Sequence, residues 1–198
     1  MRIFGSLLIC LTLLTAKPVI AQNIDLRLLQ HINGPTGSAD GLWRGVSNSD
    51  YVFVMATPAT MLITGIAQHN QTLKAEAFET GGAVLLSQGA TVLLKDVIHR
   101  QRPYLAYPNI ITGKMNSTDS SFPSGHTSAA FATATSLSLA FPKWYVIAPS
   151  FAYAGAVGYS RMYLGVHYPS DVLAGAVIGA GSAFLTFKLQ HWLEKKIP

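Results

Sequence analysis

The chain has 198 residues and a formal net charge of +5, with 49% hydrophobic and only 12% charged residues. Soluble globular domains contain about 25% charged residues, so charge is sparse in this chain. Much of the positive balance comes from three short motifs and from Lys195 and Lys196, and basic and aromatic residues do not interleave as they do in single-strand binders. The composition therefore excludes nucleic acid as a partner, and the length predicts one domain.

The N-terminal segment has the pattern of a secretory signal peptide. Arg2 precedes an apolar run, and a small-residue site follows at Ala21. We expect residues 1–21 to be a cleaved signal peptide or, without cleavage, a first membrane helix, and residues 22–198 to form a single helical domain. Cys10 lies in the apolar run, so cleavage would leave a domain without disulfides.

Six further segments have the periodicity and length of helices, and no alternating strand pattern occurs. Asn33–Asp40 predicts a turn, because it is rich in Gly, Pro and Ser. Gly175 and Gly179 lie one turn apart and favour close helix contact. The sequence predicts an all-α fold, a bundle of about five or six core helices, with helices at Ile24–Ile32, Tyr51–Gln68, Ala77–Arg100, Gly125–Ala140, Lys143–Arg161 and Ser170–Glu194.

Three uncharged runs, at residues 51–67, 144–159 and 172–187, approach the roughly 20 apolar residues of a membrane span. With the mature N-terminus outside, Lys74, Lys143 and the C-terminal lysines fall on the cytoplasmic side, as the positive-inside rule expects. We therefore expect a protein embedded in the inner membrane, with its motifs facing the periplasm. A soluble periplasmic helical domain with buried apolar helices is the alternative.

Three short motifs carry the chemistry of the sequence. Each lies at the end of an apolar run, so a helical bundle that aligns these ends would gather the motifs at one site. Cations, imidazoles and a carboxylate suit displacement at phosphorus, because the transition state spreads negative charge over three oxygens. The motifs are Lys95-x6-Arg102-Pro103, Pro123-Ser124-Gly125-His126 and Ser160-Arg161-x5-His167-x3-Asp171.

In this order and spacing, the three motifs resemble the signature of the type-2 phosphatidic acid phosphatase superfamily. That superfamily includes lipid phosphate phosphatases, bacterial acid phosphatases and vanadium haloperoxidases. The resemblance extends from Lys95 to Asp171 and implies a helical phosphatase domain. It implies hydrolysis of phosphate monoesters or diphosphates, above all those of lipids, without a cofactor.

The resemblance also implies roles for single residues. His167 would be the nucleophile that forms a phosphohistidine, Asp171 would orient its imidazole, and His126 would be the general acid. The backbone N–H groups of Ser124 and Gly125, at a helix start, would add to anion binding. The implied phosphate-binding residues are Lys95, Arg102, Ser124, Gly125 and Arg161.

The sequence has no His-x3-His or Asp-x-Asp cluster, so we expect no metal. A phosphotransferase would use the same residues, and a soluble broad-specificity acid phosphatase is a further alternative. A haloperoxidase is less favoured for so short a chain. A membrane protein that only binds anionic lipid is also less favoured, since binding alone needs the cations and not both histidines. We expect Tyr104–Phe122 to cover the pocket and to select the substrate.

Overall fold

The computed structural model describes residues 18–196, with the side chains of 18–23, 194 and 195 left aside. The N-terminal run with Cys10 and most of the predicted signal peptide therefore lie outside the described residues. Within them all regular secondary structure is helical, which confirms the all-α prediction. The helices are α2 (Pro18–Ile32), α3 (Asp40–Ala67), α4 (Gln71–Ile98), α5 (Pro103–Ala106), α6 (Gly125–Ala140), α7 (Trp144–Tyr163) and α8 (Pro169–Lys196).

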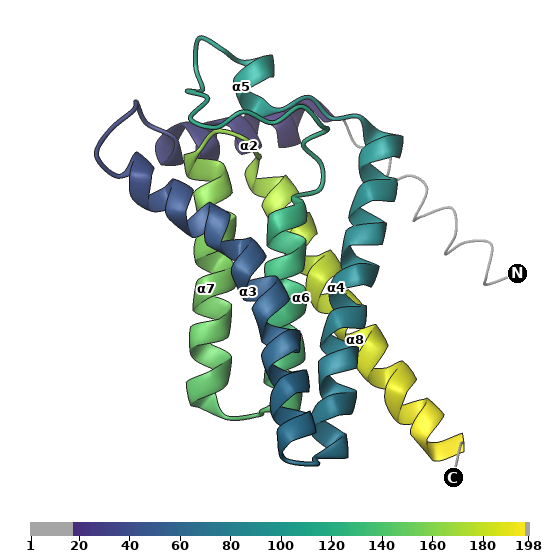
Figure 1. The fold of residues 1–198 in the computed structure, drawn as a ribbon. Coiled ribbons are helices and arrows are strands. Elements are labelled where there is room, and N and C mark those ends of the chain that lie inside the picture. Colours follow the sequence, from purple (N-terminus) through teal and green to yellow (C-terminus); the bar gives the residue numbers. More distant parts are fainter. Residues whose placement is uncertain (1–17, 197–198) are drawn as a thin grey trace, which may run out of the picture.

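Helix α6 is the centre of the bundle (Figure 1). It packs against α3, α4, α7 and α8, while α2 lies across one end of the bundle near α5 and the loop that follows it. Small side chains allow this central position: Ala130 and Ala134 are fully buried and pack against Ala154 and Val157 of α7. The turns between α3 and α4 and between α6 and α7 lie at the opposite end from α2.

Three predicted helix starts were wrong. Helix α2 begins at Pro18 and not at Ile24, α3 begins at Asp40 and not at Tyr51, and α4 begins at Gln71 and not at Ala77. The Gly and Ser residues at the start of α3 have weak helix propensity, but Trp43 packs on Tyr159 with ring centroids 4.6 Å apart. Tertiary contact thus outweighs local preference there. The short α5 was also missed; it begins with Pro103, a residue suited to a first helical turn.

The predicted close contact of the glycines in α8 is confirmed. A Cβ atom at Gly175 would lie 2.6 Å from the carbonyl oxygen of Ser124, and one at Gly179 would overlap the carbonyl oxygen of Ser128. Real Cβ atoms do not approach carbonyl oxygens so closely, so α6 and α8 reach this separation only because the two residues lack side chains.

Within residues 18–196, three helical segments are long and apolar enough to cross a membrane: Asp40–Ala67, Gln71–Ala106 and Pro169–Leu193. The first and third include two of the predicted runs, whereas the segment containing α4 takes the place of residues 144–159. Apolar side chains stand exposed on these helices, as in Leu85 (75% exposed) and Val97 (77% exposed). Exposed apolar side chains on such long helices suit lipid surroundings better than water.

We predict that Gly179→Ala destabilises the protein by about 1–3 kcal/mol, because the new methyl group forces α6 and α8 apart. Gly181→Ala is the matched control on the same helix, since a Cβ there meets nothing within 4 Å. It should be neutral or stabilising by up to about 1 kcal/mol. Unfolding of the detergent-solubilised variants measures both, and equal stability of the two variants would contradict the packing argument.

Candidate active site

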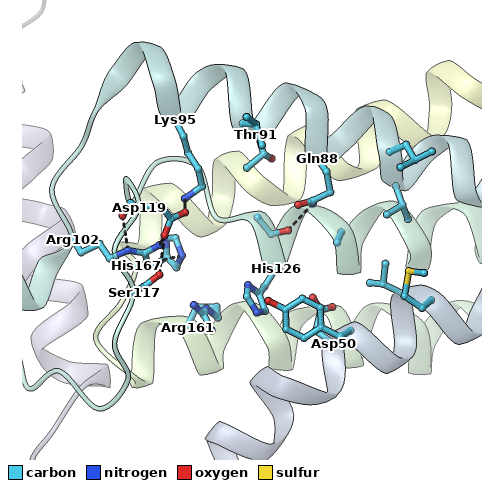
Figure 2. A pocket seen from close by; sticks show the side chains of 18 residues that line it. Asp50, Gln88, Thr91, Lys95, Arg102, Ser117, Asp119, His126, Arg161 and His167 are labelled. Carbon is cyan, nitrogen blue, oxygen red and sulfur yellow. Dashed lines mark hydrogen bonds and ion pairs between the residues drawn. The ribbon is translucent and has the colours of Figure 1, made fainter.

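A cavity of about 500 Å³ lies between α3, α4 and α6 and reaches the end of α7 (Figure 2). Six of the eight predicted site residues line it, and they come from all three motifs. Ser124 and Asp171 do not line it but are fully buried next to residues that do. The six lining residues are Lys95, Arg102, Gly125, His126, Arg161 and His167.

The second motif forms the start of α6. Ser124 is the N-cap, and its side chain accepts a hydrogen bond from the N–H of Thr127. The N–H of Ser124 donates to the carbonyl oxygen of Asp171 at 3.0 Å, so it is engaged within the protein. This N–H, which we predicted to add to anion binding, therefore donates within the protein in this structure. Gln88 of α4 holds the same turn by donating to the carbonyl of Gly125 at 3.0 Å.

His167 lies between α7 and α8, and its residue is only 1% exposed. Its Nε2 is 3.2 Å from Nη1 of Arg102. Its Nδ1 is 3.4 Å from Oδ2 of Asp171, which is long for a hydrogen bond. Burial lowers the pKa of His167 to about 4, against the opposing effect of Asp171. The imidazole is therefore neutral near pH 7, and its lone pair lies on Nε2, because Arg102 can only donate to that nitrogen.

Arg100 holds Asp171 from behind, and the sequence did not single it out. Its guanidinium donates to Oδ1 of Asp171 at 2.6 Å and to Oδ2 of Asp25 in α2 at 2.8 Å. It also stacks on Tyr168, 3.8 Å from the ring centroid. Arg100 lies two residues before Arg102, so the first motif supplies one arginine that binds Asp171 and another that contacts His167. The only sequence signal was a further arginine in that motif.

Arg102 and Arg161 are both nearly buried, at 2% and 3% exposed. Arg102 donates to the carbonyl of Val166 at 2.8 Å, which fixes it beside His167. Arg161 donates to Oγ of Ser47 in α3 at 2.5 Å. Arg161 is thus a buried guanidinium held by neutral acceptors, and its positive charge can attract an anion.

Asp119 is a second residue that the sequence did not single out. It comes from the predicted covering segment and bridges two cations, with Lys95 Nζ at 2.8 Å and Arg102 Nη2 at 2.6 Å. Partial burial raises the pKa of Asp119, but hydrogen bonds from Lys95, Ser117 and Arg102 outweigh burial and hold it well below its usual range. Asp119 is therefore an anion at the cationic end of the cavity (Figure 2).

The remaining wall of the cavity is mostly apolar and comes from α3, α4 and α6. It contains one buried acid, Asp50, which is 2% exposed and which the sequence analysis missed. His126 lies near it, with its ring centroid 5.1 Å from that of Tyr51. His99 does not line the cavity; it is the exposed C-cap of α4 with a φ of 49°. The apolar lining residues are Val54, Met55, Val84, Leu85, Val92 and Ala129.

Across residues 18–196, no group of three His, Cys, Asp or Glu side chains is arranged to hold a metal ion. The cationic and titratable side chains that line the cavity are those of arginine, lysine and histidine, and such side chains can bind an oxyanion.

The structure is an all-helical bundle in which three cations and two histidines line a part-apolar cavity, and this arrangement is typical of helical proteins that bind an oxyanion. The chain belongs to the PAP2 superfamily, whose family model matches residues 76–195.

Relatives in the family carry the names of lipid phosphatases. Undecaprenyl-diphosphatase of Sulfolobus acidocaldarius is 42% identical over 73 residues, which are 37% of this chain and 35% of that protein. Decaprenylphosphoryl-5-phosphoribose phosphatase of Mycobacterium tuberculosis is 35% identical over 102 residues, which are 50% of this chain and 53% of that protein. The chain thus spans about half or less of the length of these relatives.

Two solved structures share the fold. LpxE of Aquifex aeolicus has 29% identity and a TM-score of 0.67, over 82% of this chain and 94% of that one. The transmembrane PAP2-type phosphatidylglycerolphosphate phosphatase of Bacillus subtilis has 20% identity and a TM-score of 0.71, over 96% and 93% of the two chains. The second likeness concerns the fold alone.

We predict that Arg100→Ala destabilises the protein by roughly 3 kcal/mol, because it leaves the buried Asp171 carboxylate without its cation. The value lies at the low end for buried pairs, since the Arg100 side chain is 21% exposed. Arg27→Ala, at an exposed arginine of α2, is the control and should change stability by less than about 0.5 kcal/mol. Denaturant unfolding compares the two, and equal stabilities would show that Arg100 does not hold Asp171.

Proposed function

We propose that this chain is a phosphatase that hydrolyses phosphate monoesters or diphosphates of membrane lipids. The observation that carries the proposal is the convergence of Lys95, Arg102 and Arg161 with His126 and His167 around one cavity. The apolar part of the same cavity suits the chain of a lipid. The same substrate class is supported by the relatives, whose names describe phosphatases of isoprenyl diphosphates and lipid phosphates.

In the proposed first step, the Nε2 lone pair of His167 attacks phosphorus. The N–P bond forms while the bond from phosphorus to the leaving oxygen breaks, and His126 donates a proton to that oxygen. Burial and the charge of Arg161 lower the pKa of His126 to about 3 in the absence of substrate, so the proton that His126 donates is one that it takes from the phosphate group of the substrate on binding. The cations bind the phosphoryl oxygens, on which negative charge gathers in the transition state. His167 is suited to this role because its Nε2 lies beside Arg102, so a phosphoryl group there contacts nucleophile and cation together.

In the second step, His126 accepts a proton from water, and the water oxygen attacks the phosphohistidine. The O–P bond forms, the N–P bond breaks, and inorganic phosphate leaves. Asp171 takes part indirectly by facing Nδ1 of His167. No metal enters either step.

We further propose that the bundle is embedded in the inner membrane with the cavity at the periplasmic side. Lys74 lies in the first turn of α4 and Lys143 is the N-cap of α7, and both helix starts lie at the end of the bundle opposite the cavity, where the C-terminal end of α8 also lies. The positive-inside rule would place that end in the cytoplasm. A lipid phosphate would then reach the cavity at the level of the headgroups.

We predict that His167→Ala abolishes turnover, with a loss of at least about 10⁴-fold in kcat, because the nucleophile is absent. Asp171→Asn should lose less. His99→Asn is the control: it changes an imidazole of the first motif that is exposed and outside the cavity, and Asn tolerates its positive φ. Release of inorganic phosphate from undecaprenyl diphosphate, measured in EDTA, gives the rates. The mechanism would be refuted if His167→Ala kept full activity, or if the wild type had no activity without a divalent ion.

We predict the orientation from two cysteine variants in a Cys10→Ser background. Asn116→Cys lies in the exposed loop over the cavity, and Thr72→Cys lies at the exposed start of α4 at the other end. A maleimide that cannot cross membranes should label Asn116→Cys in intact spheroplasts, and Thr72→Cys only after lysis. The reverse pattern would place the cavity in the cytoplasm, and labelling of both in a soluble extract would rule out embedding.

A further inference from the structure

The cationic end of the cavity already contains an anion of the protein itself. The carboxylate of Asp119 bridges Lys95 and Arg102 through its two oxygens, at 2.8 and 2.6 Å. These are two of the three cations to which the proposed function assigns the phosphoryl oxygens. The third, Arg161, has no ion pair with Asp119 among the described contacts.

The residues around Asp119 complete this occupation. The backbone carbonyl of Asp119 accepts from Nε of Arg102 at 2.9 Å, and the carbonyl of Ser120 accepts from Nζ of Lys95. Ser117 Oγ donates to Oδ1 of Asp119 at 2.8 Å and so orients the carboxylate. We call residues 115–120 the strap.

The strap is fixed at both ends and exposed between them. Before it, the N–H of Lys114 donates to the carbonyl of Leu164 at 3.0 Å, and the buried Lys114 ammonium pairs with Asp40 at 3.3 Å. After it, the N–H of Ser121 donates to the carbonyl of Arg100 at 2.8 Å. The Asp119 side chain itself is 54% exposed. Within the strap, the backbone of Ser117 is held by two hydrogen bonds with the hydroxyl of Tyr104. The Asp119 side chain can therefore turn away from the cations without breaking any of these anchors.

A phosphoryl group at His167 and the carboxylate of Asp119 compete for the same donors. Nη1 of Arg102 faces Nε2 of His167, and Nη2 of Arg102 donates to Asp119. A phosphoryl group that bonds to His167 must therefore lie close to both nitrogens of this guanidinium group. Two anions bound to neighbouring nitrogens of one guanidinium group repel each other. Binding of substrate therefore requires Asp119 to move away.

We propose that Asp119 is a specificity-determining residue: its carboxylate occupies the phosphate subsite and yields it to terminal phosphates but not to singly charged anions. The inference rests on the proposed function, whose phosphate site it deepens. A phosphodiester offers one charge and two free oxygens, which is no more than the carboxylate offers. A terminal phosphate offers three oxygens and close to two charges, so it binds Lys95, Arg102 and Arg161 together.

Binding of two small anions to the full-length protein in detergent tests the inference. Inorganic phosphate represents terminal phosphates and dimethyl phosphate represents diesters, each titrated by calorimetry at pH 8 and low salt. If Asp119 blocks the subsite about nine-tenths of the time, Asp119→Asn should bind phosphate roughly tenfold more tightly. Dimethyl phosphate should gain by a similar factor, but from an affinity too weak to measure in the wild type, so that its binding becomes detectable only in Asp119→Asn.

Asp96→Asn is the matched control, because it removes the same charge from the exposed residue next to Lys95 in α4. It should leave both affinities near those of the wild type. Ser117→Ala keeps the charge but removes a hydrogen bond to Asp119, so it should tighten phosphate binding to a smaller degree. This variant carries the test if Asp119→Asn does not fold.

Phosphate affinity that is unchanged or weaker in a folded Asp119→Asn variant would overturn the inference, and so would an equal gain in Asp96→Asn. Turnover that still depends on His167 would then leave the proposed function standing. The opposite outcome is that Asp119→Asn binds phosphate more tightly while the wild type shows no turnover. That result would support the inference that Asp119 occupies the phosphate subsite and would contradict the proposed phosphatase function.

Discussion

The site depends on one backbone contact, where the first turn of α6 meets the start of α8. The N–H of Ser124 donates to the carbonyl of Asp171, and the absent side chain of Gly175 leaves room for the carbonyl of Ser124. Two helices come this close only where no Cβ atom lies between them. The contact fixes the place of His126, two residues after Ser124, relative to His167, four residues before Asp171. Two motifs more than thirty residues apart in the chain thereby share one cavity.

The charges of the site fall into two groups on either side of His167. Behind it, Arg100 is bound between Asp25 and Asp171, and its partners belong to the fold. In front of it, Arg102 lines the cavity, and its acidic partner Asp119 is more than half exposed. Burying an ion is costly unless it is paired, so the rear group has fixed partners and serves structure. The front group has a partner at the surface, and an exchange of that partner for another anion costs the protein little.

The sequence was sufficient wherever a property is local. Helix α6 was predicted with both of its ends, because the Ser-Gly start and the Phe-Pro end are signals within the chain. The motif residues were predicted because their types and spacing suit phosphorus chemistry. Arg100 and Asp119 were missed because their importance depends on partners that only the fold brings near, such as Asp25, 75 residues before Arg100. The start of α3 was missed for the same reason, since it relies on the packing of Trp43 against α7.

An empty phosphate site presents a physical problem that this arrangement addresses. Lys95, Arg102 and Arg161 converge in a cavity with apolar walls, and such like charges repel one another most strongly when no anion is bound. Strong binding of phosphate and stability of the empty protein thus make opposite demands on the same cations. A carboxylate on an anchored strap meets both, because it neutralises the cations in the absence of substrate and is covalently retained when it leaves. The anion that replaces it must offer more charge and more oxygens than a carboxylate, so stability of the empty site and selectivity for terminal phosphates have one physical origin.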